Sequence, residues 1–224
     1  MSPVAGVVAV LHRGDVGSEL LHWVRRLPPD VKLALPRGNQ IARQRNAAVM
    51  EYGIPPWTLF VDSDSVPPPD ALARIVAVRE PIVAGVVLER MYPHKVAAVK
   101  SLDPPERWAL ADLPRSGLVP CPAFGAGFMP VRGEVFEALD FPWFRCGQIT
   151  PDLLHEDMEF CLRAGKAGFQ PVLDAGIRVG HTTSAVLWPG LDGRPWVEWS
   201  GPMEHREHLD DIRSAYAEVL NAGG

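Results

Sequence analysis

The 224-residue chain lacks the marks of several protein classes. No apolar run approaches the roughly 18 residues of a membrane-spanning helix, so we expect no transmembrane segment. Lysine and arginine (22) are outnumbered by aspartate and glutamate (27), and the net charge of −5 argues against a general nucleic-acid surface. The three cysteines show no C-x-x-C spacing, which predicts reduced thiols in a cytoplasmic protein.

Targeting and repeat signals are also missing. The apolar start of the chain has no basic segment before it, so we interpret residues 4–11 as a buried strand and not as a signal peptide. The 23 prolines and 20 glycines are spread without a period, which indicates turns and no repeat. With 224 residues, 47% of them hydrophobic, the chain is expected to form one large domain, or one domain with a subdomain, around a substantial core.

The first 90 residues alternate between strand and helix patterns. Apolar, β-branched runs predict the strands, and apolar residues at helical spacing predict the helices. The predicted strands are 4–11, 31–35, 57–61 and 82–88, and the predicted helices are 17–27, 40–52 and one that starts at 69–70. This alternation predicts an α/β fold with a parallel sheet and helices on both faces. Ligands of such sheets gather beyond the carboxyl ends of the strands.

The pattern changes after residue 90. Predicted strands cover 95–102, 118–121 and 170–173, and residues 124–131 are predicted to turn into another short strand. Predicted helices cover 132–139 and 155–166. Residues 182–202 hold three tryptophans among glycine and proline, which predicts a long loop. An amphipathic stripe over 203–221 predicts a C-terminal helix.

Asp62 and Asp64 follow the predicted strand 57–61. If the backbone stays extended through both, their side chains point to the same side. Two carboxylates at a strand end suit Mg²⁺ or Mn²⁺, which leave coordination positions for phosphate oxygens. The structural alternative is a strand end in which aspartate caps a turn, since D-x-D is a common pattern.

The second half supplies partners for this pair. Glu156 and Asp157 begin a predicted helix, where negative charge is favourable, so one interpretation is that they cap the helix. The functional interpretation is that one of the two carboxylates acts as a general base on an acceptor hydroxyl. His181 follows an apolar run, where a lone histidine is more often structural than a ligand. Its functional interpretation is a further metal ligand, better suited to Mn²⁺ than to Mg²⁺.

The helix 40–52 begins near the strand ends. Arg43 and Asn46 are three residues apart, so they share a face and could reach a diphosphate or fix the acidic loop. We expect Arg45 to lie on a solvated charged face.

Taken together, these residues resemble the GT-A nucleotide-sugar glycosyltransferases, especially the family 2-like group. The matching features, in chain order, are Ala42-Arg43-x-x-Asn46-Ala47, the D-x-D motif Asp62-Ser63-Asp64, the segment Gly125-Ala126-Gly127-Phe128 leading to Arg132 and Phe136, and the E-D motif Glu156-Asp157 with its helix through Phe169. The match covers roughly residues 4 to 181, with boundary errors of about 2–4 residues.

The resemblance implies one GT-A domain, Rossmann-like, with a mostly parallel central sheet flanked by helices and a small acceptor-side subdomain. Residues 1–90 would be the nucleotide-binding half and 91–181 the sugar and acceptor half. Asp62, Ser63 and Asp64 would hold the donor diphosphate through Mn²⁺ or Mg²⁺, with His181 as a metal ligand. Asp157, or less favourably Glu156, would be the base of an inverting transfer.

The same resemblance implies roles for two further groups. Backbone at Gly125, Ala126 and Gly127 would approach the donor sugar. Trp188, Trp196 and Trp199 would form a lid or acceptor platform, although buried anchors of the loop are an equal alternative.

The sequence also departs from the family. Leu11, His12 and Arg13 stand where the family has a Pro-x-aromatic-Asn turn, and Arg37 stands where an acidic residue often reads the base. We expect these residues to contact the donor, but the nucleotide stays open between UDP and GDP, and a retaining mechanism stays open too. The acceptor is an unidentified hydroxyl compound.

Two other functions stay open. One is a catalytically silent nucleotide- or sugar-binding module on the same fold. The other is a nucleotidyltransferase, which would need a glycine- and lysine/arginine-rich signature after the first strand. Arg13-Gly14-Asp15 at this position is too short to be such a signature.

Overall fold

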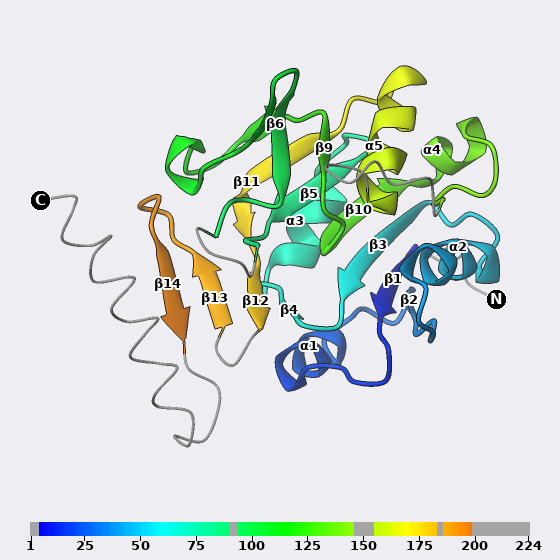
Figure 1. The fold of residues 1–224 in the computed structure, drawn as a ribbon. Coiled ribbons are helices and arrows are strands. Elements are labelled where there is room, and N and C mark those ends of the chain that lie inside the picture. Colours follow the sequence, from blue (N-terminus) through cyan, green and yellow to red (C-terminus); the bar gives the residue numbers. More distant parts are fainter. Residues whose placement is uncertain (1–4, 90–93, 146–154, 183–185, 199–224) are drawn as a thin grey trace, which may run out of the picture.

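The computed structural model describes residues 5–89, 94–145, 155–182 and 186–198 (Figure 1). Its N-terminal part contains the parallel strands β1 (Gly6–Leu11), β2 (Val31–Ala34) and β3 (Trp57–Asp62), in the order β2-β1-β3. The connecting helices are α1 (Ser18–Val24) and α2 (Ile41–Glu51). These elements confirm the alternation predicted for this region.

Strand β1 shows why the sequence folds in this way. All six of its residues are buried, because helices cover both faces of the sheet. Val7 and Ala9 pack into the core beneath α2, whereas Val8 and Val10 pack into the core beneath α1 and α3 (Ala71–Ala77). The continuous apolar run is therefore needed by both layers of the fold.

The sheets are mixed, so the structure shows the expected mostly parallel central sheet only in part. Strand β10 (Phe128–Arg132) pairs antiparallel with the other edge of β3, and the bridge between Ile82 and Val131 links it to β5 (Val83–Val86). Strand β5 pairs in parallel with β11 (Val172–Arg178), which pairs antiparallel with β8 (Leu118–Pro120). The general α/β prediction is confirmed. The antiparallel strands come from the second half of the chain, where no helix separates β8, β9 (Ala123–Phe124) and β10.

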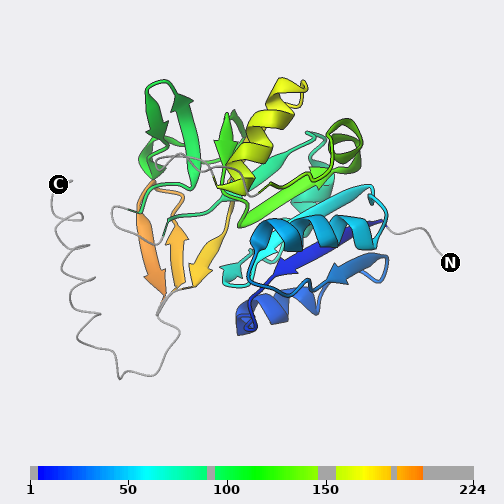
Figure 2. The ribbon, with the colours of Figure 1, turned by 45° about the vertical axis from the view of Figure 1, so that its right-hand side comes forward.

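Two further sheets lie beyond these strands. One has the order β7-β6-β9, with β6 (Ala98–Leu102) and β7 (Pro105–Arg107). The other has the order β14-β13-β12-β4, with β4 (Ser65–Val66), β12 (Gly180–Thr182), β13 (Val186–Pro189) and β14 (Pro195–Glu198). In both views the β13–β14 hairpin lies at the opposite end of the molecule from β2 (Figures 1 and 2).

This hairpin overturns the prediction of a long loop over 182–202. Strands β13 and β14 pair antiparallel, and Trp188 lies directly opposite Trp196. Apolar, β-prone residues on both sides of the turn at Gly190–Gly193 favour this pairing. Trp199, Cys146 and the predicted helix 203–221 lie outside the described residues.

The remaining helices are the 3₁₀ turn η1 (Leu110–Asp112), α4 (Gly133–Ala138) and α5 (Glu156–Lys166). Aromatic rings fix α5 to the sheet: Phe160 stacks on Phe144 with centroids 4.4 Å apart, and Phe144 meets Phe60 edge-on at 5.1 Å. The start of α5 is thereby held beside the carboxyl end of β3. No helix within the described ranges is long and apolar enough to cross a membrane.

Candidate active site

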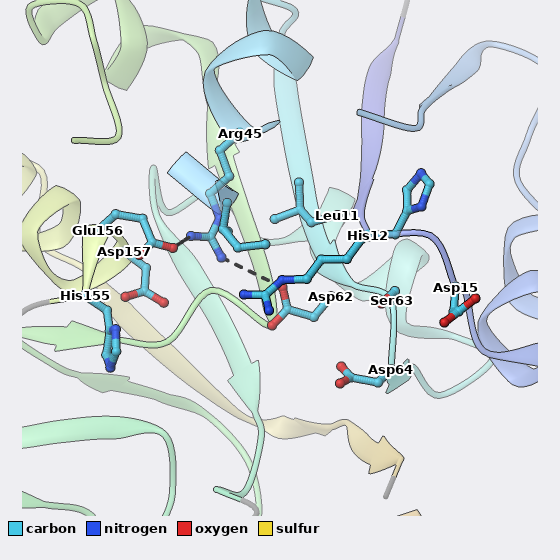
Figure 3. A pocket seen from close by; sticks show the side chains of 12 residues that line it. Leu11, His12, Asp15, Arg45, Asp62, Ser63, Asp64, His155, Glu156 and Asp157 are labelled. Carbon is cyan, nitrogen blue, oxygen red and sulfur yellow. Dashed lines mark hydrogen bonds and ion pairs between the residues drawn. The ribbon is translucent and has the colours of Figure 1, made fainter. Parts of the chain in front are cut away.

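A cavity of about 630 Å³ lies at the carboxyl ends of β1 and β3, against the start of α5 (Figure 3). It brings together eight of the residues predicted from the sequence and four that were not predicted as ligand contacts. The predicted residues are Leu11, His12, Arg13, Asp62, Ser63, Asp64, Glu156 and Asp157, and the additional ones are Asp15, Ile41, Arg45 and His155. Its position agrees with the rule that α/β sheets bind ligands beyond strand ends.

Backbone contacts fix the acidic motif. The Ser63 N–H donates to the Leu11 carbonyl (3.1 Å), and the Asp62 N–H donates to the Gly127 carbonyl (3.0 Å). The chain turns at Ser63 and Asp64 before β4 begins. The premise that the backbone stays extended through both aspartates is therefore wrong, and Figure 3 shows their carboxylates apart.

Arg45 is the main correction to the sequence analysis. It was expected on a solvated face, but its side chain is only 2% exposed and lies between α2, β3 and α5. Its Nη1 donates to Glu156 Oε1, and its Nη2 is 3.8 Å from Asp62 Oδ1. The guanidinium carbon also lies 5.5 Å from the centre of the Phe144 ring. Arg45 is therefore a buried cation that balances two carboxylates of the cavity.

Arg43 and Asn46 do not act as the predicted pair. Arg43 is exposed to solvent and does not line the cavity. The Asn46 side chain is buried, and it donates to the Phe144 carbonyl (2.8 Å) and accepts from the Phe144 N–H (3.0 Å). The rotation of α2 explains both corrections, because the face that meets the core carries Ala42, Arg45, Asn46 and Val49.

Arg37 is also exposed and does not line the cavity, although a parallel bridge joins it to His12. Gln44 fixes this end of the site: its Oε1 accepts from the His12 N–H (2.9 Å), and its Nε2 donates to the Gly38 carbonyl (2.7 Å). His12 therefore keeps its predicted place at the cavity, whereas Arg37 does not.

Asp157 connects α5 to the glycine-containing segment. Its Oδ2 accepts from the Ala126 N–H (2.9 Å), and its Oδ1 accepts from the Met158 N–H (2.8 Å). A Cβ added at Gly125 would lie 3.8 Å from Asp157 Oδ2, and one added at Gly127 would lie 3.4 Å from Asp62 Oδ2. The backbone of this segment thus runs close to both carboxylates.

A second cavity of about 360 Å³ adjoins the first and shares Asp62, His155 and Asp157 with it. Gly125, Ala126, Gly127 and His181 line this second cavity, together with Val87, Leu88, Glu89, Ala97, Arg107 and Met158. All predicted sugar-side residues in the glycine segment therefore lie at one connected site.

Asp62 stands where the two cavities meet. Removal of water by the surrounding protein raises the pKa of its carboxyl group, and Asp157 and Glu156 raise it further, while Arg45 and His181 lower it. The direction of the net shift is upward, although 41% of the Asp62 side chain is exposed to solvent.

The donor chemistry of His181 and Asp64 fits a divalent cation. His181 Nδ1 donates to the Leu88 carbonyl (2.9 Å), so in the neutral ring Nε2 carries the lone pair, and it lies 3.6 Å from Asp64 Oδ2. Within the described ranges, no three His, Cys, Asp or Glu side chains form a ready metal cluster. Mg²⁺ and Mn²⁺ do not require one, since phosphate oxygens and water complete their coordination.

The spacing of apolar residues along α2 contains a signal that Arg45 is buried. Ala42, Arg45 and Val49 follow the three- and four-residue spacing of a buried helical face. His155 is the residue before the E-D motif, at the N-cap of α5, and it lines the cavity, but a lone histidine before a helix carries no specific signal.

Comparisons with known proteins bear on the fold. No protein-family model matches the chain, and no curated protein matches it. The crystal structure of A197 from STIV is similar, with a TM-score of 0.63 and 18% identity over 89% of this chain and 98% of that chain. The crystal structure of GalNAc-T7 with UDP, GalNAc and Mn²⁺ has a TM-score of 0.50 and 11% identity over 80% of this chain and 44% of that chain. Identities this low concern the fold alone, and the chain has a glycosyltransferase-like fold.

Proposed function

We propose that the chain is a metal-dependent GT-A glycosyltransferase of the family 2-like group, which transfers a sugar from a UDP- or GDP-linked donor to a hydroxyl acceptor. The observation that carries the proposal is the meeting of the Asp62–Asp64 turn, the Glu156–Asp157 helix start and His181 around two connected cavities. The similar fold of GalNAc-T7, crystallised with UDP, GalNAc and Mn²⁺, supports a nucleotide sugar as donor.

In this proposal the larger cavity receives the nucleoside diphosphate. Leu11, His12, Arg13 and Ser63 line it. Asp64 and His181 would hold Mn²⁺ or Mg²⁺, with Asp62 contributing directly or through water. The bound cation would neutralise the charge that develops on the departing diphosphate.

Asp157 is the proposed general base of an inverting transfer. An ionised carboxylate offers about four acceptor sites, and the Ala126 and Met158 N–H groups use two of them. A remaining lone pair of Asp157 can take the proton of the acceptor hydroxyl. The hydroxyl oxygen then bonds to the anomeric carbon of the donor sugar while the bond from that carbon to the diphosphate breaks. Glu156 is less suited, because Arg45 already pairs with its carboxylate.

The β13–β14 hairpin is the proposed acceptor platform. It extends the sheet that contains β12, the strand of His181. Trp188 is partly exposed on this hairpin, and an aromatic face of this kind packs well against the apolar face of a sugar ring.

The test uses the full chain with UDP-glucose, UDP-galactose, UDP-GlcNAc, GDP-mannose and dTDP-glucose, each with Mn²⁺, Mg²⁺ or EDTA, and measures release of the nucleoside diphosphate. We expect metal-dependent release from at least one donor. Asp157→Asn should retain donor binding in calorimetry but lose about 10²–10⁴-fold in turnover. Asp30→Asn, at an exposed carboxylate that lines neither cavity, is the matched control.

Three outcomes separate the candidates. Failure to bind or cleave any nucleotide sugar with either metal contradicts the proposal. Binding without turnover, in the wild type and in Asp157→Asn alike, identifies a silent binding module. Full turnover by Asp157→Asn removes this residue as the base and favours a retaining mechanism or Glu156.

A further inference from the structure

The smaller cavity contains an ion pair that the proposed catalytic steps do not use. Glu89 follows β5, Arg107 ends β7, and Arg107 Nη1 lies 2.9 Å from Glu89 Oε1. Both side chains line the same cavity as Asp62, Asp157 and His181. The pair is partly exposed, with 27% of the Arg107 side chain and 34% of the Glu89 side chain accessible. It therefore presents polar atoms to a ligand while remaining inside the site.

Backbone contacts hold the two partners in place. The Glu89 N–H donates to the Lys95 carbonyl (2.9 Å). Arg107 lies opposite Val99 in the β6–β7 ladder, and the next residue, Trp108, donates its N–H to the Ala98 carbonyl (3.1 Å). Since the backbone on both sides is fixed, little conformational entropy remains to be lost when a ligand binds to the pair.

The hydrogen-bonding capacity of the pair is not used up. Arg107 Nη1 is buried and lies 2.9 Å from Glu89 Oε1, so this nitrogen belongs to the ion pair and a ligand would use the other N–H groups of the guanidinium. The Glu89 carboxylate accepts through its remaining lone pairs, and the guanidinium has five N–H donors. One acceptor and one donor group thus stand side by side at the cavity wall.

We infer that Glu89 and Arg107 select the sugar of the donor by binding two neighbouring hydroxyl groups of a neutral hexose, an inference that rests on the proposed function. A hydroxyl group both donates and accepts, so a vicinal diol matches the carboxylate and the guanidinium together. The pair carries no net charge, and Asp62 and Asp157 add negative charge to the same cavity. A uronic acid is disfavoured there, because its carboxylate would face these two aspartates.

The sizes of the two cavities agree with a nucleoside diphosphate in the larger cavity and a sugar in the smaller one. The larger one, of about 630 Å³, meets the phosphate-side residues, and the smaller one, of about 360 Å³, meets the glycine segment and the ion pair. Asp62 and Asp157 line both cavities, so the bond between the sugar and the diphosphate would lie where the two cavities meet. Glu89 and Arg107 are then specificity residues that touch the sugar away from the reacting carbon.

The test compares the Kd of UDP with that of UDP-glucose, or of GDP with that of GDP-mannose, in the presence of Mn²⁺, using the donor that the wild type cleaves best. Glu89→Gln and Arg107→Met should leave the Kd of the free nucleotide unchanged and weaken nucleotide-sugar binding about tenfold. Glu106→Gln is the matched control, since it removes a carboxylate from the exposed Lys100–Glu106 pair on the same β6–β7 hairpin.

A second measurement uses UDP-glucuronate, whose sugar carries a carboxylate. Glu89→Gln should bind it better relative to UDP-glucose than the wild type does. Unchanged nucleotide-sugar affinity in both variants overturns the inference while metal-dependent turnover of the wild type keeps the proposed function. Equal weakening of UDP and UDP-glucose also overturns it, because the pair would then support the site as a whole. A wild type that neither binds nor cleaves a nucleotide sugar contradicts the proposed function itself.

Discussion

Asp62 and Asp64 are separated by one residue, yet their carboxylates have different neighbours. Asp62 faces Arg45, a buried guanidinium that also holds Glu156. Asp64 lies within the turn, and its Oδ2 is 3.6 Å from the Nε2 atom of His181. Arg45 is a fixed charge of the fold, whereas His181 is neutral when its ring carries a single proton.

This difference separates structural from ligand-dependent functions within one motif. The Arg45 side ties α2, β3 and α5 together through contacts within the protein. The Asp64 side combines a carboxylate with a histidine whose tautomer is fixed by the Leu88 carbonyl, an arrangement typical of metal ligands. We therefore expect variants on the first side to change stability and variants on the second side to change metal binding.

Arg45→Met should have the largest effect. It leaves the Glu156 carboxylate without its partner next to the Asp62 carboxylate, and we expect the free energy of unfolding to fall by about 3 kcal/mol. Urea denaturation without metal measures this change. Arg43→Met, on the exposed side of the same helix, should stay within about 0.5 kcal/mol of the wild type. Equal stability of the two variants would remove Arg45 from its structural role.

His181→Ala should affect the Asp64 side of the motif, where we expect the metal to bind. The loss of the imidazole should weaken Mn²⁺ binding at least about tenfold, measured by calorimetry with Mn²⁺ and UDP. His22→Ala, at an exposed histidine on α1, is the matched control. Stability without metal should change much less than in Arg45→Met. Wild-type Mn²⁺ affinity in His181→Ala would break the contrast between the two aspartates.

Asn46→Ala sharpens the comparison on the Arg45 side. The variant leaves the Phe144 N–H and carbonyl without their side-chain partner, and we expect a loss of about 2 kcal/mol in the free energy of unfolding. The exposed Asn39→Ala is the control and should stay within about 0.5 kcal/mol. If Asn46→Ala instead weakened UDP binding at full stability, the original expectation of a diphosphate contact would be restored.

Much of the site could be predicted because it depends on local order. Strand ends place Leu11 and Asp62 at one edge of the sheet, and a β-α-β pattern is sufficient to bring such ends together. Glu156 reaches the same edge through the packing of α5 against the sheet. Arg45, Asn46 and Arg37 could not be placed in the same way. Their roles depend on the rotation of α2 and on the residues that face it from distant parts of the chain.

The Trp-rich segment shows a second limit of local reasoning. Glycine and proline predicted a loop, but Trp188 pairs with Trp196 in a hairpin that continues the sheet of β12 and β4. Strand β12, which pairs with β4 on one side and with β13 on the other, provides a hydrogen-bonding partner that local composition does not reveal. The mixed character of the central strands has the same cause, since β10 joins β3 from a remote position.

The amino-acid sequence by itself determined the α/β alternation, the buried parallel strands and the acidic groups at their ends, because periodicity and turn residues act within a few residues of one another. Only the tertiary structure decided the partners of those groups. It turned the chain between Asp62 and Asp64, buried Arg45 against Glu156, and set His181 opposite Asp64. Burial and charge pairing are properties of the packed chain, and they distinguish two aspartates that the D-x-D pattern treats as equivalent.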